Sequence, residues 1–163
     1  LLKNKNLIIQ PHPIGIVNEN VEDLFNINDK IVISFVGRVE YYKGIDIFLN
    51  TIIKLDSSKK LNKEISIIIG GKSNTNLVMP QTQNIKIDHY NRFLTDDELD
   101  SIIKYSKIIV LPYRNATASG ILTRVIKMNT PAIVSNQGCL PDYIQNGVNG
   151  FIYNNAIIIL NFK

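Results

Sequence analysis

The feature that most constrains the fold of this chain is a regular alternation of short runs rich in Ile and Val with amphipathic stretches. Strands that are apolar throughout and separated by helices are typical of a parallel sheet that helices cover on both faces. We therefore predict a doubly wound α/β fold. The expected strands cover residues 31–37, 65–71, 84–90, 107–113, 131–135 and 150–153, and the expected helices cover residues 43–55, 95–106, 121–128 and 141–145.

A capping signal supports the helix at 95–106. Thr95 precedes three acidic residues, and Glu98 stands three positions after it, which is the pattern of a capping box. The acidic residues of this first turn need no catalytic explanation, because negative charge stabilises the positive end of the helix dipole.

Charge and cysteine content narrow the class of protein. The length of 163 residues suits one domain, and the formal net charge is +4 with a sequence pI near 9.1. Because Lys and Arg are spread along the chain, we expect no nucleic-acid partner. A basic pocket for an anionic ligand, or attraction to an acidic membrane surface, accounts for the excess of positive charge.

The single cysteine bears on the cellular compartment. Cys139 alone forms neither an internal disulfide nor a multi-cysteine zinc site, which favours a reducing compartment. With no signal-peptide layout and no run of roughly 20 apolar residues, a cytoplasmic location is predicted.

Two cations and one loop are expected to meet at the same edge of the sheet. Arg38 follows the glycine that ends the first strand, Lys43 precedes the next glycine, and the loop RNATASG at 114–120 leads into a helix. In a parallel sheet such loops all emerge at the carboxyl edge, where open α/β folds bind ligands. The helix N-terminus offers unpaired N–H groups, and the small residues before it let an anion approach them. Residue type alone favours solvated surface charges, but position at this edge favours a phosphate site.

The GGKS stretch and the two histidines do not indicate a further catalytic or metal-binding site. The stretch GGKS at 70–73 is not a P-loop, because Ser66 stands where that motif needs its first glycine. Its two glycines either let a ligand or a neighbouring loop approach the strand end or form a tight turn. His12 and His89 do not suggest a metal pair, and we expect His89, within a strand, to have a satisfied structural role. Neither a metal nor a cofactor is expected.

Four segments occur in an order that is specific to one family. They are GRVEYYKG at 37–44, IIIGG at 67–71, the run TDDELDSIIKYSKIIVLPYRNATASGIL at 95–122 and the proline-led PAIVSNQGCLPDYIQNGVNGFIY at 131–153. In this order they resemble the C-terminal donor-binding domain of family 4 glycosyltransferases, and the likeness covers roughly residues 30–153. Enzymes with this GT-B fold consist of two Rossmann-like domains facing a cleft. The resemblance implies that this chain is one such half, a Rossmann-like parallel sheet with helices on both faces.

The resemblance also implies residue roles. In relatives the Arg of GR and the Lys of KG contact the donor diphosphate, so Arg38 and Lys43 are the predicted catalytic residues, which stabilise charge on the leaving group. Residues 119–121 would add backbone donors, and residues 90–93 would lie against the base. The predicted substrate-binding residues are Gly37, Gly70, Gly71, Tyr90, Arg92, Phe93, Ala118, Ser119, Gly120 and Ile121.

The implied reaction is transfer of a sugar from a nucleotide sugar, most often a UDP-sugar, with retention of configuration and without a required metal. We expect residues 1–20 to be an interdomain crossing segment and residues 21–163 to be the donor-binding domain, lacking its closing C-terminal helices. An acceptor glycan or lipid-linked sugar would bind through an N-terminal domain that this chain lacks, so the chain alone should transfer no sugar. The expected process is polysaccharide or glycoconjugate synthesis, with peripheral association at the inner face of the plasma membrane suggested by the basic charge.

The sequence departs from the family at two acidic positions. Many members carry two glutamates with seven residues between them, linked to the sugar hydroxyls and the ribose, where this chain has Ala116 and Arg124. We interpret Arg124 as an exposed helix residue, together with Lys127 on the same helix. Two alternatives therefore stay open: a truncated, non-catalytic nucleotide-binding or interaction module, and a GT-B epimerase acting on a UDP-sugar.

Overall fold

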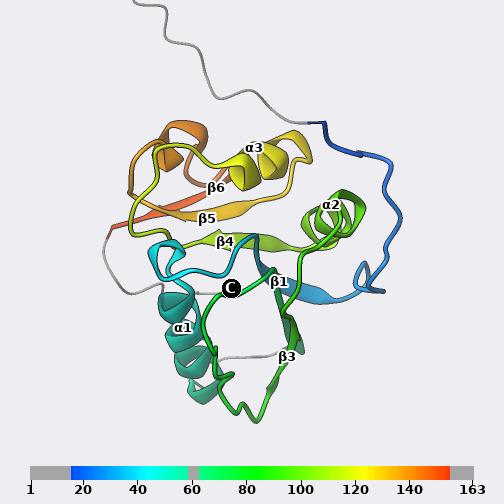
Figure 1. Cartoon of the computed structure of the whole chain (residues 1–163), viewed down its shortest axis with the longest axis vertical. Helices are drawn as coiled ribbons and strands as arrows, with labels where there is room; N and C mark the ends of the chain where they lie inside the picture. The colour runs from blue at the N-terminus through cyan, green and yellow to red at the C-terminus, as the bar shows by residue number, and fades with distance from the viewer. Residues whose placement is uncertain (1–15, 59–62, 155–163) are drawn as a thin grey trace, which may run out of the picture.

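The computed structural model describes residues 16–58 and 63–154, which form a six-stranded sheet with helices on both faces (Figure 1). All strand pairs are parallel, in the order β3-β2-β1-β4-β5-β6. The predicted parallel α/β sheet is therefore confirmed. The strands are β1 (Ile31–Val36), β2 (Ile65–Gly70), β3 (Ile85–Tyr90), β4 (Ile108–Leu111), β5 (Ala132–Ser135) and β6 (Gly150–Tyr153).

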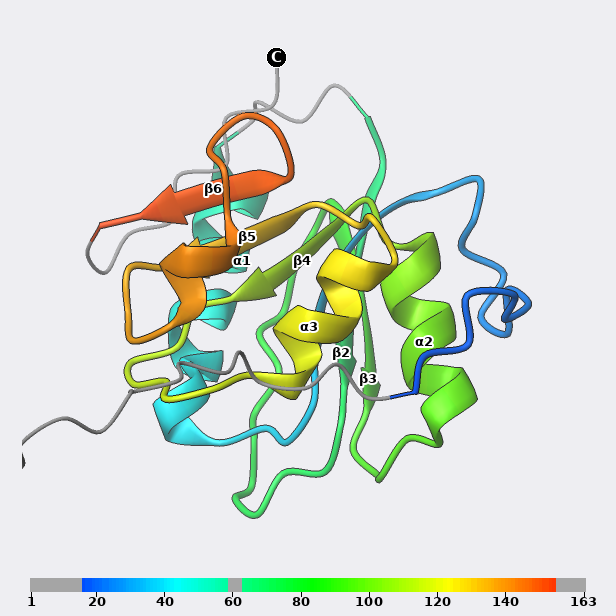
Figure 2. The same cartoon turned by 90° about the horizontal axis from the view of Figure 1, so that it is seen from above.

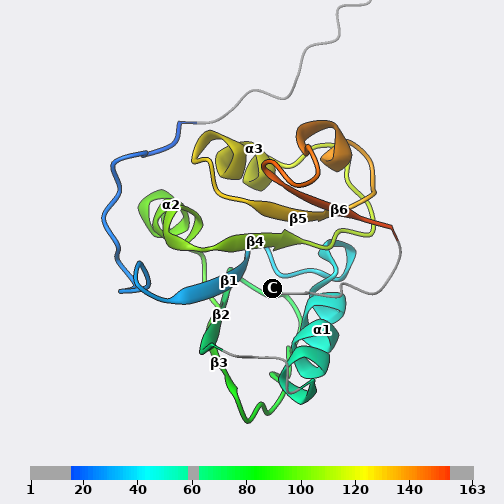
Figure 3. The same ribbon diagram turned by 180° about the vertical axis from the view of Figure 1, so that it is seen from behind.

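Helix α1 (Ile45–Ser57) covers one face of the sheet, and α2 (Asp96–Tyr105) and α3 (Gly120–Lys127) cover the other (Figure 3). Two 3₁₀ turns, η1 (Tyr41–Lys43) and η2 (Leu140–Tyr143), complete the elements. The helix expected from residue 43 begins two residues later, because Gly44 adopts the left-handed conformation, with φ of 73°, between η1 and α1. The short helix expected at 141–145 is the 3₁₀ turn η2 instead.

The capping box of α2 is formed as predicted. The Thr95 hydroxyl accepts from the Glu98 N–H at 3.2 Å, and the Glu98 carboxylate accepts from the Thr95 N–H at 2.9 Å. Two otherwise unpaired donors are thereby satisfied, which fixes where the helix starts.

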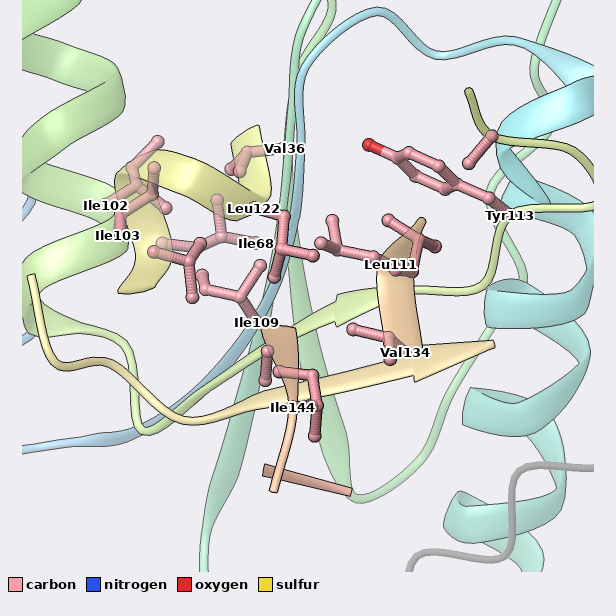
Figure 4. Packing of buried hydrophobic residues seen from close by; sticks show 14 of the residues in the cluster. Val36, Ile68, Ile102, Ile103, Ile109, Leu111, Tyr113, Leu122, Val134 and Ile144 are labelled. Atoms are coloured by element: carbon pink, nitrogen blue, oxygen red, sulfur yellow. The ribbon is translucent and has the colours of Figure 1, made fainter. Parts of the chain in front are cut away.

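Two hydrophobic clusters lie on opposite faces of the sheet, because successive side chains of a strand alternate between its faces. In β1, Val32 and Val36 belong to the cluster beneath α2 and α3, whereas Ile33 and Phe35 pack with α1. Figure 4 shows the first cluster, in which side chains from the strands meet those of α2 and α3. Every described strand except the edges is covered on both faces, in agreement with its largely apolar sequence.

The segment before β1 packs on α2. The Asn18 N–H donates to Asp100 at 2.8 Å, and the carbonyl of Val21 accepts from the Lys104 ammonium at 3.0 Å and from the Tyr105 hydroxyl at 3.1 Å. The part of the predicted crossing segment at residues 1–15 and the chain after residue 154 lie outside the described residues. Within residues 16–58 and 63–154, every helix is too short or too polar to cross a bilayer.

The parallel arrangement places the loops that follow β1 and β4 at one edge of the sheet. Figure 2 shows the η1 turn beside the loop that leads from β4 into α3. This juxtaposition comes from the order of the strands, since β1 and β4 are neighbours in the sheet although they are distant in sequence.

Candidate functional site

A pocket of about 370 Å³ opens at the carboxyl edge between the loops that follow β1 and β4. It brings the two predicted cations together with the small residues at the start of α3, as the sequence pattern indicated. None of its lining residues is acidic, so its fixed charge is positive. The lining residues are Arg38, Tyr42, Lys43, Tyr113 and residues 115–121.

Lys43 is the more buried of the two cations, with only 8% of its surface exposed. Its ammonium lies 5.3 Å from the ring centroid of Tyr113 and 6.0 Å from that of Tyr42. Burial lowers the pKa of Lys43, and the nearby positive charge of Arg38 lowers it further. Among the described residues no carboxylate forms an ion pair with it. The carboxylate of Glu40 opposes these two causes only in part, so a buried cation against two ring faces favours an anionic ligand that would offset the lowered pKa.

Arg38 lies at the mouth of the pocket, with 64% of its side chain exposed and one guanidinium nitrogen 3.6 Å from Glu40. This ion pair is exposed and contributes little to stability. The guanidinium is therefore available to a ligand, and its planar fork suits the oxygens of a phosphate group.

The N-terminus of α3 forms another wall of the pocket. The Ser119 hydroxyl caps the helix by accepting from the Leu122 N–H at 3.2 Å. A side chain built on Gly120 would meet nothing within 4 Å, so open space lies above its backbone. The first N–H groups of a helix have no intrahelical partner, and with Ser119, Gly120 and Ile121 in the wall they are suited to an anion.

Tyr113 is a pocket residue that sequence reasoning missed. It is 3% exposed, and burial raises its pKa to about 12, with the nearby Ser119 hydroxyl opposing the shift. Its Oη is buried and makes no hydrogen bond of good geometry with the described residues. Figure 4 shows the ring extending from the end of β4 toward Val36 and Leu122. The sequence signal that could have identified Tyr113 is its position directly after Pro112 at the end of a predicted strand.

The glycines of the predicted set serve the packing of the loops. Gly37, with φ of 101°, lies against Lys43, since a Cβ there would be 3.1 Å from the Lys43 ammonium. A Cβ on Gly71 would be only 1.9 Å from the carbonyl oxygen of Gly37, so Gly71 lets these two loops approach each other. A Cβ on Gly70 would be 2.9 Å from Leu94. Of the options left open for the GGKS stretch, close approach of a neighbouring loop is therefore the one observed at Gly71.

The structure does not bring residues 90–93 to the pocket wall. Tyr90 packs edge-on against Phe25 with 5.1 Å between ring centroids and lines a separate cavity of about 200 Å³. Arg92 donates to both carboxylate oxygens of Glu98. Phe93 is 75% exposed. Residues 90–93 lie at the same carboxyl edge of the sheet, but at the end of β3, which β2 separates from β1.

The interpretation of Arg124 as an exposed residue is wrong. Only 15% of its side chain is exposed, and its guanidinium donates to Asp100 at 2.5 Å and to Asp96 at 2.7 Å. Lys127 is also partly buried and lies 3.5 Å from Glu19. The helical periodicity placed both side chains away from the sheet, but α2 packs beside α3 and covers that side. At the other family position, Ala116 is buried and lines the pocket.

The expectation of a satisfied His89 is also wrong. Its Nε2 is buried without a hydrogen-bond partner among the described residues, and burial lowers its pKa. In the same described ranges, no cluster of three or more His, Cys, Asp or Glu side chains could hold a metal ion.

The sequence family described as "Glycosyl transferases group 1" matches residues 17–157, which is more than half of the chain. Among curated relatives, the D-inositol 3-phosphate glycosyltransferase of Corynebacterium kroppenstedtii is 26% identical over 130 residues, which cover 74% of this chain and 29% of that protein. This chain therefore spans less than a third of the length of that relative.

Two solved structures share the fold. HepE of Anabaena, solved in complex with UDP-glucose, aligns with a TM-score of 0.58 and 11% identity over 80% of this chain and 36% of that one. The lipopolysaccharide outer core galactosyltransferase WaaB, solved in its apo form, aligns with a TM-score of 0.59 and 16% identity over 88% of this chain and 40% of that one. At these levels of identity the two alignments show a shared fold.

Proposed function

Because this chain belongs to the glycosyl transferases group 1 family, we propose that it is the donor-binding domain, C-terminal in position, of a family 4 glycosyltransferase that takes its sugar from a nucleotide sugar. The observation that carries the proposal is the pocket in which Arg38, the buried Lys43 and the start of α3 converge without an acidic residue. Such a site suits a diphosphate, the charged part of nucleoside diphosphate sugars such as UDP-sugars.

The proposed chemistry is electrostatic. When the bond between the anomeric carbon and the diphosphate oxygen breaks, the electron pair stays on the leaving nucleotide and the sugar becomes oxocarbenium-like. Lys43 and Arg38 then stabilise the new charge on the diphosphate, and the N–H groups of α3 add to this effect. The low-dielectric position of Lys43 strengthens its interaction with that charge. The acceptor oxygen forms the new bond to the anomeric carbon, its proton passes to the leaving diphosphate, and retention of configuration is the proposed outcome.

The finer assignments are proposals as well. UDP is the proposed nucleotide, in line with the UDP-glucose complex of HepE, and Gly37, Gly70 and Gly71 shape the loops around it. We place the base near residues 90–93 and the phosphates at residues 118–121. The proposed process is polysaccharide or glycoconjugate synthesis, at the cytoplasmic side of an anionic membrane that attracts the net positive charge.

The acceptor site is proposed to lie in the part of such a protein that this chain does not span. The curated relative is more than three times as long as the matched region, so the acceptor glycan or lipid-linked sugar has room to bind outside it. The chain alone should then bind nucleotide without sustained turnover of a UDP-sugar. Sustained turnover would contradict this part of the proposal.

Calorimetric titration of the 163-residue chain with UDP, GDP and ADP tests the donor site. One nucleotide should bind weakly, in about the millimolar range that corresponds to roughly 4 kcal/mol. The variant Arg38→Ala/Lys43→Ala should lose about tenfold or more of that affinity, since two charge-assisted contacts are removed. A matched control is Lys86→Ala/Lys107→Ala, which removes two positive charges near the amino ends of β3 and β4 and should leave binding unchanged.

Two results would count against the proposal. Absence of binding to all three nucleotides, with the fold intact, would mean that the pocket is not a donor site. Equal losses in the two double variants would mean that net charge, and not the pocket, attracts the nucleotide. Retained binding without transfer after an acceptor domain is supplied would instead favour a non-catalytic nucleotide-binding module.

A further inference from the structure

We propose that Arg114 is a positioning residue that holds Lys43 in place for the donor diphosphate, an inference that rests on the proposed function of Lys43. Arg114 is absent from the pocket wall, and its guanidinium is already occupied. It lies in the loop after β4, whereas Lys43 lies on the η1 turn after β1. Its effect on a ligand would therefore pass through the turn that carries Lys43.

Among the described residues, the hydrogen bonds of Arg114 go to the η1 turn and the start of α1. Its two terminal nitrogens donate to the two carboxylate oxygens of Asp46, each at 2.6 Å. One of them also donates to the carbonyl of Tyr41 at 2.8 Å, and the guanidinium lies 4.0 Å from the Tyr41 ring centroid. Its backbone N–H donates to the carbonyl of Tyr42 at 2.7 Å. One residue thus fixes the turn on both sides of Lys43.

The backbone of the two loops is also in direct contact. A Cβ on Gly44 would lie 1.9 Å from the carbonyl oxygen of Pro112, so only a glycine allows this approach. The residue after Lys43 is therefore pressed against the same loop that Arg114 anchors. The ammonium of Lys43 reaches the ring of Tyr113, which comes from that loop too. The position of Lys43 depends on how the η1 turn docks on this loop.

Lys43 needs such positioning because its surroundings do not hold its charge. Burial and the charge of Arg38 lower its pKa, and the carboxylate of Glu40, which lies 3.6 Å from Arg38, opposes this lowering only in part. A long side chain in such a site would turn to solvent if its backbone were free to move. Asp46 cancels the charge of Arg114, so the contribution of the pair is geometric, with little direct attraction for an anion.

The test is a double-mutant cycle on UDP affinity, measured by calorimetry on the full chain. Arg114→Met should weaken UDP binding by about fivefold or more, and in a Lys43→Met background the same change should have less than about a twofold effect. Arg114→Lys, which keeps the charge but loses the bidentate fork, should also weaken binding. A fivefold loss that persists in the Lys43→Met background would overturn the proposal.

The variant Asp46→Asn tests whether UDP binding becomes weaker or tighter when the partner of Arg114 loses its charge. Removing a negative charge near a cationic pocket would strengthen anion binding if electrostatics alone acted, whereas loss of the Arg114 anchor should weaken it. Weaker UDP binding supports the proposal, and tighter binding refutes it. Lys86→Met, which breaks an exposed ion pair with Asp88 on β3, is the matched control and should leave UDP affinity unchanged.

An NMR readout separates failure of this inference from failure of the proposed function. The ε-methylene signals of Lys43 should show ring-current shifts from Tyr113, and Arg114→Met and Arg114→Lys should move them toward random-coil values. Absence of UDP binding by the unaltered chain would refute the donor site, but the NMR comparison would still decide the positioning role. Unchanged Lys43 signals in both variants would overturn it.

Discussion

Replacing Arg124 with Met should destabilise the fold by about 3–5 kcal/mol, the usual cost of leaving one partner of a buried ion pair uncompensated. Asp100 is 1% exposed and accepts from Arg124 at 2.5 Å and from the Asn18 N–H at 2.8 Å. Without the guanidinium of Arg124, the buried carboxylate of Asp100 accepts only from the neutral N–H of Asn18 and has no positive charge to pair with. Met retains the apolar part of the side chain, so the change isolates the charge. Against a total of about 5–15 kcal/mol for a domain, the loss is large.

Urea denaturation followed by circular dichroism measures this loss. The urea concentration at the midpoint of unfolding should fall. The slope of the unfolding free energy against urea should stay the same, because the folded chain buries the same surface. Arg124→Met/Asp100→Leu should recover most of the stability, since a buried pair replaced by apolar residues is often neutral. Lys86→Met is the control for an exposed pair, and its urea midpoint should stay close to that of the unaltered chain.

The reasoning would be refuted by a loss under about 1 kcal/mol for Arg124→Met, which would mean that the pair with Asp100 is not the stabilising contact. UDP affinity should be unchanged in this variant, because Arg124 does not line the pocket. A tenfold loss of affinity with unchanged stability would make Arg124 a ligand-binding residue, contrary to its partners in the structure.

The other predictions concern pH and backbone conformation. The hydrogen bond from Arg92 lowers the pKa of Glu98 to about 2 from its usual 4.5, so its contribution to stability is present above about pH 5 and is lost as the pH falls toward 2. Glu98→Gln should therefore reduce the difference between urea midpoints at pH 7 and pH 3, and an unchanged difference would exclude this carboxylate as the cause. Gly44→Ala should lower the melting temperature far more than Gly147→Ala, because both glycines have positive φ but only the first would place a Cβ 1.9 Å from the carbonyl oxygen of Pro112. Equal melting temperatures for the two variants would contradict the close approach of the loops.

Two of the mistaken expectations, those for Arg124 and His89, have a common cause. Arg124 was assigned to solvent because it lies opposite the apolar residues of its own helix, yet α2 lies beside that helix and supplies Asp96 and Asp100. His89 was expected to have a satisfied structural role because it lies within a strand, yet its Nε2 has no hydrogen-bond partner among the described residues. The surroundings of both side chains depend on residues that are distant in sequence. The hydrophobic periodicity of a helix or strand carries no information about such residues.

The sequence by itself determined the sheet, the start of α2 and the edge at which Arg38 and Lys43 meet the α3 loop. Apolar runs separated by helices leave a parallel sheet as the favoured arrangement, and chain direction alone then sends every strand-to-helix loop to one edge. The tertiary structure decided the rest: that Lys43 is buried against Tyr113, and that Arg114 pairs with Asp46, 68 positions earlier. Local propensity acts over a few residues, whereas a side chain's burial and partner depend on which loops and helices pack together in three dimensions.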